Sequence, residues 1–349
     1  MPRLRRVDCG EQGIHRRRHG RGFSYVDACG ERIDDPDTLE RIGNLAIPPA
    51  WKDVWICPYP TGHIQATGFD AAGRKQYRYH DAWRTRRDAD KFESMVGFAK
   101  ALPALREQVE NDLTLDGMPR ERALACAVRL LDRGSFRIGS EDYAEDNGTY
   151  GLATMRKEHV TVRGDTVAFD YEAKGGLRRR QRVIDADAAG VVKALLRRRG
   201  GGDELLAYRD GRRWRDVRSA DINAYLKDAS GGAFSAKDFR TWNATVLSAI
   251  ALAVSAPVAG GSKTARKRAM KRAVDEVSRH LGNTPAVCRA AYIDPRVFDR
   301  FDGGLTIGGV LPELAADAEG WPAVQRTVEE AVLDLIAGDE SSDAIEKAA

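Results

Sequence analysis

The chain has 349 residues and a net charge of +4, and this length exceeds the roughly 100–200 residues of a typical single domain, so we expect two domains. The longest apolar stretch, around 246–258, is interrupted by Ser248 and Ser255, which argues against a membrane span. The basic N-terminus lacks the apolar segment of a secretory signal, so we expect a cytoplasmic protein.

The cysteines and histidines give no sign of a disulfide framework or a metal centre. The five cysteines are odd in number and scattered, with no C-x-x-C spacing, so we expect free thiols. The six histidines form no H-E-x-x-H pattern, so the sequence predicts no metal site.

The charge is distributed unevenly along the chain. Residues 293–349 carry 4 Lys/Arg against 13 Asp/Glu, a balance of −9, so residues 1–292 carry +13. A basic body is typical of proteins that bind a polyanion, because Lys and Arg release the counterions condensed on phosphates. A merely solvated surface remains an alternative, and charge alone says nothing about chemistry.

The N-terminal part is predicted to be rich in strands. Residues 22–84 contain many Gly, Pro and aromatic residues, with strand-like pieces at 54–56 and 63–67 between turn signals. From Ala89 onward, apolar residues recur at helical spacing, and past Pro103 they continue on the same face. We therefore predict a β-rich domain over 1–90 and a second domain over 91–349.

The second domain is predicted to be mainly helical with a small sheet. A helix opens at Pro119 and stops near Gly134. Alternating residues at 159–162, 166–171 and 181–184 predict a three-stranded meander, which places Lys174 at a hairpin tip. Further helices are expected at about 186–198, 220–228, 236–255, 264–281, 285–292 and 322–337.

Several segments resemble the type IB DNA topoisomerases, in their short bacterial and poxviral form. In the N-terminal half the matching blocks are Ile47–Trp51, Gln65–Gly68 and Gly73–His80. In the C-terminal half they are Phe136–Gly139, Gly151–Thr154, Lys174, Lys237–Trp242, Asn283–Pro285 and Arg289–Tyr292. The resemblance implies an α+β protein with a small β-rich DNA-capping domain and a mainly α-helical catalytic domain that contains a three-stranded sheet.

The resemblance places the nucleophile at Tyr292. A phenol titrates near pKa 10, so it needs nearby cations or a base to gain phenolate character at neutral pH. The alternative, an ordinary tyrosine on an amphipathic helix, is set aside only because of the motif around Tyr292.

The resemblance also assigns three basic residues to catalysis. Phosphoryl transfer builds negative charge on non-bridging oxygens, and the planar guanidinium groups of Arg137 and Arg240 match that geometry. Arg240 lies near the start of a predicted helix, where the helix dipole also favours an anion. Lys174 is the implied general acid that protonates the leaving 5′-oxygen. A solvated surface position is the alternative for each of them.

The remaining catalytic position holds histidine in many relatives, but here it is Asn283. Asparagine donates a hydrogen bond but exchanges no proton, so we expect it to act only as an electrostatic stabiliser. His280 is a candidate substitute, although one helical turn separates it from the expected position.

The DNA-contact residues implied by the resemblance are Gln76, Tyr77, Tyr79, Lys237 and Tyr143. Glutamine suits bidentate reading of adenine, and tyrosine can meet a phosphate or a thymine methyl group. The alternative for Tyr77 and Tyr79 is that they pack on one face of a strand into the capping domain.

No nucleotide or metal cofactor is expected. The segment Gly260–Thr264 resembles a phosphate loop but lacks the upstream glycine of that motif. No acidic pair suggests Mg²⁺, and a transesterification through phosphotyrosine needs neither ATP nor metal.

These features predict a type IB topoisomerase that relaxes supercoiled DNA through a 3′-phosphotyrosyl intermediate. We expect a cytoplasmic, nucleoid-associated monomer that clamps duplex DNA and binds no membrane. One alternative is a tyrosine site-specific recombinase, which shares the Arg, Lys and Tyr chemistry. The other is a DNA-binding protein without enzymatic activity.

Overall fold

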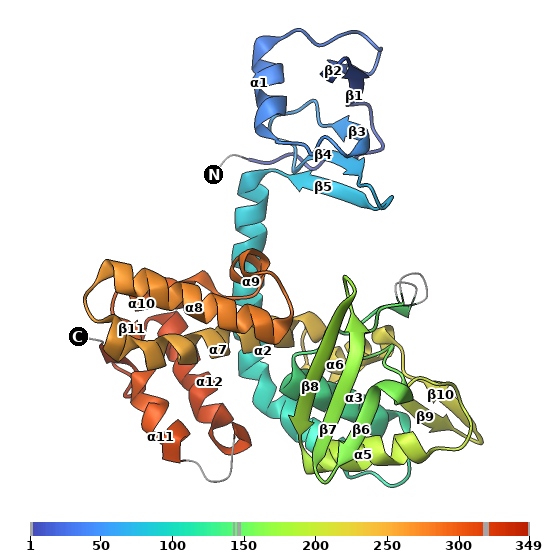
Figure 1. Ribbon diagram of the computed structural model, residues 1–349, viewed down its shortest axis with the longest axis vertical. Coiled ribbons are helices and arrows are strands. Elements are labelled where there is room, and N and C mark those ends of the chain that lie inside the picture. Colours follow the sequence, from blue (N-terminus) through green and yellow to red (C-terminus); the bar gives the residue numbers. More distant parts are fainter. Residues whose placement is uncertain (1–2, 142–143, 145–147, 317–320, 348–349) are drawn as a thin grey trace. The chain divides into compact units, whose positions relative to one another are not determined.

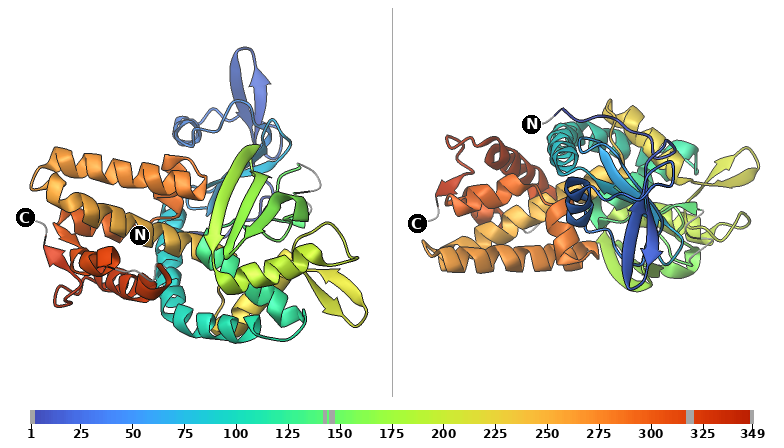
Figure 2. Two further views of the ribbon diagram at one scale, coloured as in Figure 1. Left: turned by 60° about the horizontal axis from the view of Figure 1, so that its bottom comes forward. Right: turned by 90° about the horizontal axis from the view of Figure 1, so that it is seen from above.

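The computed structural model describes residues 3–141, 144, 148–316 and 321–347, with helices and strands in both parts of the chain. The predicted α+β class is confirmed. The chain divides into two compact units, Met1–Phe92 and Glu93–Ala349, which are shown in Figure 1 and from two further sides in Figure 2. The division falls inside a helix, so no linker marks it.

The first unit is built on an antiparallel five-stranded sheet of order β2-β1-β3-β4-β5. The strands are β1 (Ile14–His19), β2 (Gly22–Val26), β3 (Lys52–Ile56), β4 (Ile64–Phe69) and β5 (Lys75–Tyr79). Helix α1 (Pro36–Asn44) adds Ile42 to a core that contains Ile14, Val54, Ile56 and Ala66.

Local hydrogen bonds explain part of the N-terminal sequence blocks. The guanidinium of Arg16 donates to the carbonyl oxygens of Pro48 (3.1 Å) and Trp51 (2.6 Å), which holds the Ile47–Trp51 loop against the sheet. The side chain of Gln65 is buried and donates to the carbonyl of Gly62 (2.7 Å). These residues therefore shape the unit from within.

Helix α2 (Asp81–Leu113) runs unbroken through Pro103. This agrees with the helical periodicity that the sequence shows on both sides of the proline. Leu102 and Leu105 on either side are almost fully buried, and this packing offsets the backbone hydrogen bond that a proline inside a helix removes.

The second unit combines helices with a three-stranded antiparallel sheet, as predicted. The sheet is β6 (Val160–Arg163), β7 (Thr166–Ala173) and β8 (Leu177–Ile184), in that order. The main helices are α3 (Arg120–Gly134), α5 (Ala186–Arg197), α6 (Ser219–Ser230), α7 (Ala236–Ala259), α8 (Lys263–Leu281), α9 (Pro285–Ala291), α10 (Pro295–Asp302), α11 (Leu311–Ala316) and α12 (Trp321–Ala337). Two short antiparallel pairs complete the unit, β9 (Ala207–Asp210) with β10 (Arg213–Asp216) and β11 (Leu305–Thr306) with β12 (Glu346–Lys347).

Helix α7 runs through the second unit and contacts several other helices. By length and composition alone it could cross a membrane, and it is the one such helix within the described residues. More than half of its apolar window, 56%, is buried inside the protein, which is the pattern of a core helix.

The acidic C-terminal segment packs onto the second unit. Glu329 of α12 accepts hydrogen bonds from Arg106 of α2 (2.6 Å) and from the indole of Trp242 of α7 (3.2 Å). Within the segment, β11 and β12 pair as a short antiparallel sheet. It is therefore an integral part of this unit.

Candidate active site

Arg137 follows a tight reversal at the end of α3. Ser135 caps the helix in the left-handed conformation, with φ at 51°. The Arg137 carbonyl then accepts from the amide of Leu152 (2.9 Å). A Cβ atom on Gly151 would lie 2.4 Å from the Cα of Gly139, so glycine allows the two segments to touch. The blocks 136–139 and 151–154 thus hold Arg137 from both sides.

Arg240 is positioned by the first turn of α7. The amide of Ser235 donates to the Asp238 carboxylate (2.7 Å) in a capping box that fixes where the helix begins. Phe239 and Trp242 are buried and anchor the same turn. The Arg240 side chain is only 4% exposed.

The Arg240 guanidinium reaches two backbone carbonyls from different helices. It donates to the carbonyl of Ser135 at the end of α3 (2.5 Å) and to that of Leu281 at the end of α8 (3.0 Å). Its Cζ atom lies 5.2 Å from the centre of the Tyr292 ring. Arg240 therefore joins the nucleophile candidate to the helix ends around it.

Tyr292 lies at the C-terminal end of α9. Thr284 caps this helix and Pro285 opens it, as the sequence predicted. The amide of Tyr292 donates to the carbonyl of Cys288 (3.0 Å). Just beyond it, the amide of Asp294 donates to the buried hydroxyl of Thr245 on α7 (3.1 Å). The backbone on both sides of Tyr292 is therefore anchored.

Asn283 and Arg137 contact each other directly. Arg137 donates to the side-chain oxygen of Asn283 through a short hydrogen bond and to the carbonyl of Gly282 (2.8 Å). The amide nitrogen of Asn283 is buried and has no hydrogen-bond partner within the described residues. One cluster thus contains Arg137, Arg240, Asn283 and Tyr292. Within it, the amide nitrogen of Asn283 can donate a hydrogen bond to a phosphate oxygen.

A further cation, Arg179 of β8, belongs to this cluster and was not predicted. Its guanidinium donates to the carbonyls of Arg279 (3.1 Å) and His280 (2.7 Å) in the last turn of α8. Gly282 beside it has a φ of 66°, a conformation that glycine adopts without strain, and a Cβ there would also lie 2.6 Å from a guanidinium nitrogen of Arg179. Arg179 stands in a run of three arginines at 178–180, and nothing in the sequence distinguishes it from its neighbours.

The cluster carries a strong positive potential. Desolvation by burial lowers the pKa of the Arg240 guanidinium, and Arg137 and Arg179 lower it further, whereas Tyr292 acts in the opposite direction. An arginine stays charged despite such a shift. An anion at this position, whether a phosphate or a phenolate, would relieve the repulsion among the guanidinium groups.

Lys174 lies in the turn between β7 and β8 and is exposed. Gly175 and Gly176 follow with φ values of 84° and 71°, a conformation that glycine adopts without strain. The predicted hairpin tip is therefore confirmed, and its role as general acid stays a prediction.

The side chain of His280 is directed elsewhere. It lines a groove of about 370 Å³ between α7 and α8, together with Leu247 and Ile250. Partial desolvation lowers its pKa, with Arg179 and Arg240 contributing. Asn283, and not His280, therefore holds Arg137.

The first unit carries the predicted DNA-contact residues on β5. Tyr77 and Tyr79 are 42% and 40% exposed and stack on each other with ring centres 5.9 Å apart. The alternative in which they pack into the domain is wrong. Gln76 points to the other face of the strand and donates to the Asp70 carboxylate (3.0 Å).

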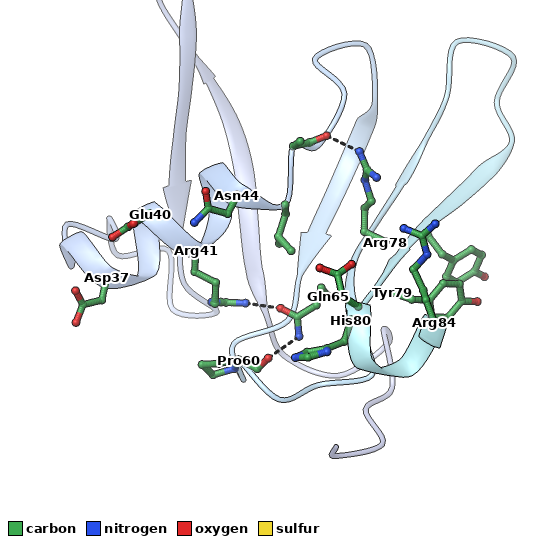
Figure 3. Close-up of a pocket in the computed structure, with 14 residues that line it drawn as sticks. Asp37, Glu40, Arg41, Asn44, Pro60, Gln65, Arg78, Tyr79, His80 and Arg84 are labelled. Carbon is green, nitrogen blue, oxygen red and sulfur yellow. Dashed lines mark hydrogen bonds between the residues drawn. The ribbon is translucent and has the colours of Figure 1, made fainter. Parts of the chain in front are cut away.

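A polar cavity of about 870 Å³ lies in the first unit, where α1, β5 and the start of α2 meet (Figure 3). Arg41 donates to Gln65 (2.9 Å) across one wall, and Arg78 donates to the carbonyl of Ala46 (2.8 Å) at another. Tyr77 and Tyr79 also line it. The exposed tyrosines therefore border a hollow rather than a flat surface.

Two predicted contact residues remain. Lys237 is exposed in the first turn of α7, while Tyr143 falls outside the described residues. Within those residues, no group of three or more His, Cys, Asp or Glu side chains could hold a metal ion.

Comparison with known proteins places this site in a family. Residues 80–301 match the family described as eukaryotic DNA topoisomerase I, catalytic core, and residues 22–70 match the family described as bacterial DNA topoisomerase IB, N-terminal domain.

Individual relatives agree with these matches. The chain is 29% identical over 289 residues to DNA topoisomerase 1B of Acanthamoeba polyphaga mimivirus, covering 81% of this chain and 85% of the relative. It is also 29% identical over 129 residues to DNA topoisomerase 1 of Daucus carota, covering 36% of this chain and 15% of the relative. For DNA topoisomerase 1 of Schizosaccharomyces pombe, the identity is 28% over 160 residues, covering 45% of this chain and 19% of the relative.

Proposed function

The chain belongs to the type IB DNA topoisomerases, and on that premise we propose that Tyr292 is the nucleophile that cleaves one strand of duplex DNA. The single observation that carries this assignment is the Arg240 guanidinium, whose Cζ lies 5.2 Å from the centre of the Tyr292 ring. A guanidinium there stabilises the negative charge that develops in the transition state of phosphoryl transfer.

In each step of the proposed reaction, one phosphorus–oxygen bond forms as another breaks. The phenolic oxygen of Tyr292 attacks the scissile phosphorus and releases its proton to solvent water. The bond from phosphorus to the 5′-oxygen breaks, and its electron pair goes to that oxygen, which takes a proton from Lys174. The products are a 3′-phosphotyrosyl bond and a free 5′-hydroxyl. After the free end has rotated, the 5′-hydroxyl attacks the phosphotyrosine and restores the strand.

The other members of the cluster stabilise the pentacoordinate phosphorus. Arg137 and Arg240 direct N–H groups toward the non-bridging oxygens, and Asn283 supplies the buried amide nitrogen that lacks a partner within the described residues. These groups are already held by helix ends, so little reorganisation accompanies the reaction. Because bond energy is kept in the phosphotyrosine, the reaction needs neither ATP nor a metal ion.

We also propose the wider context of this activity. The protein acts as a monomer, with both units closing around duplex DNA, in the cytoplasm and associated with the nucleoid. The match of residues 22–70 to a bacterial topoisomerase IB N-terminal domain favours supercoil relaxation over site-specific recombination.

The test uses a supercoiled plasmid without a recombination site, in EDTA and without ATP. The wild-type protein should relax both negative and positive supercoils. Tyr292→Phe should bind DNA but form no covalent adduct on a denaturing gel, because only the attacking oxygen is lost. Strict dependence on Mg²⁺ or ATP, or an adduct that persists in Tyr292→Phe, would contradict the proposal.

A further inference from the structure

A basic hairpin, Ile14–Val26, formed by β1 and β2, projects from the sheet of the first unit (Figure 2). Residues 12–26 contain four arginines and no acidic residue. Only Ile14 and His15 pair with β3, so the rest of β1 pairs with β2 alone. The distal part of the hairpin is therefore a two-stranded ribbon of concentrated positive charge.

Only one of these four arginines has a structural role evident from its hydrogen bonds. Arg16 holds the Pro48 and Trp51 carbonyls and lies over the ring of Phe23. Arg17, Arg18 and Arg21 are exposed and form no ion pair among the residues that the structure describes. Their charges are uncompensated within the unit, which is the state expected of side chains that meet phosphates.

Strand register places part of this charge on the same sheet face as Tyr77. Tyr77 pairs with Thr67, Thr67 with Trp55, and Trp55 with His15. Directly paired residues share a face. Side chains alternate along a strand, so Arg17 shares this face with His15, while Arg18 points the opposite way.

The distances suit one continuous duplex. β1 and β5 are three strand spacings apart, about 14 Å, and Arg17 lies two residues, about 7 Å, beyond the row that contains Tyr77. Arg17 is thus about 16 Å from Tyr77, which corresponds to about five base pairs along the helix axis of the duplex. A two-stranded ribbon also fits the major groove of DNA, where phosphates lie on both sides.

We propose that the basic hairpin is a second DNA-binding element, in which Arg17 and Arg18 contact the phosphates of opposite strands about five base pairs from the Tyr77 contact. This inference rests on the proposed function, because it requires that β5 faces DNA. It extends the binding surface beyond the residues that the sequence motifs identified.

The test measures DNA affinity against salt for the full chain carrying Tyr292→Phe, which removes cleavage. Arg17→Ala/Arg18→Ala in this background should lower the slope of log affinity against log salt by up to about 1.8, since each lost phosphate contact removes about 0.9. Affinity at about 0.1 M salt should fall on the order of tenfold or more. Arg17→Lys/Arg18→Lys should keep most of the slope, because charge is conserved.

The matched control is Arg212→Ala/Arg213→Ala on the β9–β10 hairpin, which removes the same charge from exposed positions of the second unit. The control should change the slope less than the hairpin variant. The difference should also disappear on duplexes shortened to end less than about five base pairs beyond the Tyr77 contact.

The hairpin proposal would be overturned if Arg17→Ala/Arg18→Ala kept its thermal transition and left the salt slope of DNA affinity unchanged. It would also be overturned if the control Arg212→Ala/Arg213→Ala changed that slope equally. A covalent adduct in Tyr292→Phe would instead overturn the proposed function. The two failures are therefore distinguishable.

Discussion

Asn283 offers the catalytic cluster a hydrogen-bond donor but no proton. Its oxygen accepts from Arg137 and its amide nitrogen is buried without a partner within the described residues. Asn283→Ala should lower the single-turnover cleavage rate by about 10² to 10³, the usual loss for one transition-state donor. Asn283→His keeps a donor and should retain much of the activity. Small and equal effects of both changes would show that Asn283 has no role in the transition state.

Lys174 can be tested by changing the leaving group. Lys174→Ala should slow cleavage of ordinary DNA by at least about 10², because the 5′-alkoxide leaves poorly without a proton. A substrate with sulfur in place of the bridging 5′-oxygen releases a thiolate, whose conjugate acid has a much lower pKa. On this substrate the defect of Lys174→Ala should nearly vanish.

Arg240→Ala is the control for this experiment. The Arg240 side chain stabilises the non-bridging oxygens whichever atom leaves, so its loss is not compensated by a better leaving group. This variant should stay defective on the sulfur substrate. If the Lys174→Ala defect also persists there, Lys174 binds phosphate and the proton has another source.

At the residue scale, the sequence predicted the members of the cluster only where a motif surrounds them. Arg137, Arg240, Asn283 and Tyr292 meet in space, as their motifs implied. Arg179 could not be found this way, because it stands in a run of three arginines. Its neighbours Arg178 and Arg180 both pair with Asp170 on the sheet surface. Only the docking of β8 against α8 distinguishes Arg179.

At the scale of elements, Arg179 connects the strand that follows Lys174 to the helix that precedes Asn283. Arg179→Ala removes two hydrogen bonds at the end of α8 and should displace Gly282 and Asn283. We expect a loss of about tenfold to 10² in the cleavage rate with little change in DNA affinity, since small displacements of catalytic groups have effects of this size.

The matched control is Arg178→Ala on the same strand, whose exposed pair with Asp170 is screened by solvent and contributes little to stability. It should cleave at nearly the wild-type rate. Arg179→Lys should restore part of the activity by reaching one carbonyl. Equal rates for Arg178→Ala and Arg179→Ala would exclude a positioning role for Arg179.

Elements with strong local signals were predicted well. The helix at Pro285 has a threonine cap and an opening proline, and the meander at 160–184 has clear turns. Helix α1 and the β9–β10 pair are short and were missed, although Asp35 caps α1 and Pro36 opens it. Helix α2 continues through Pro103, because tertiary packing around Leu102 and Leu105 outweighs the local tendency of proline to end a helix.

At the scale of the whole molecule, the uneven charge has a structural explanation. The acidic C-terminal segment contributes Glu329 to a buried network with Arg106 of α2, Asp132 of α3 and Trp242 of α7. The sequence showed the charge of this segment but could not show that Glu329 pairs with Trp242 and Arg106, which lie 87 and 223 residues away along the chain.

This network should dominate the stability of the second unit. Burial opposes the charge of Arg106, but Asp132 and Glu329 raise its pKa above the usual value. Burial likewise opposes ionisation of Asp132, yet Arg106 holds the pKa of that carboxyl below its usual range. Arg106→Ala would leave two buried carboxylates without their cation. We expect a loss of about 3–5 kcal/mol in the free energy of unfolding at neutral pH, measured by urea unfolding followed by tryptophan fluorescence.

The pH dependence gives this prediction a second, independent readout. Because the pKa of Asp132 is depressed in the folded protein, its contribution is present above the unfolded value of about 3.9 and is lost as pH falls through the folded value. In Arg106→Ala the unpaired carboxyls become easier to protonate, so the deficit relative to wild type should shrink between pH 7 and pH 4. The control is Arg326→Ala, whose exposed pair with Glu330 on α12 is screened by solvent and contributes little to stability. A deficit in Arg106→Ala no larger than that of the control, or one that grows as the solution becomes more acidic, would show that the network does not hold α12 in place.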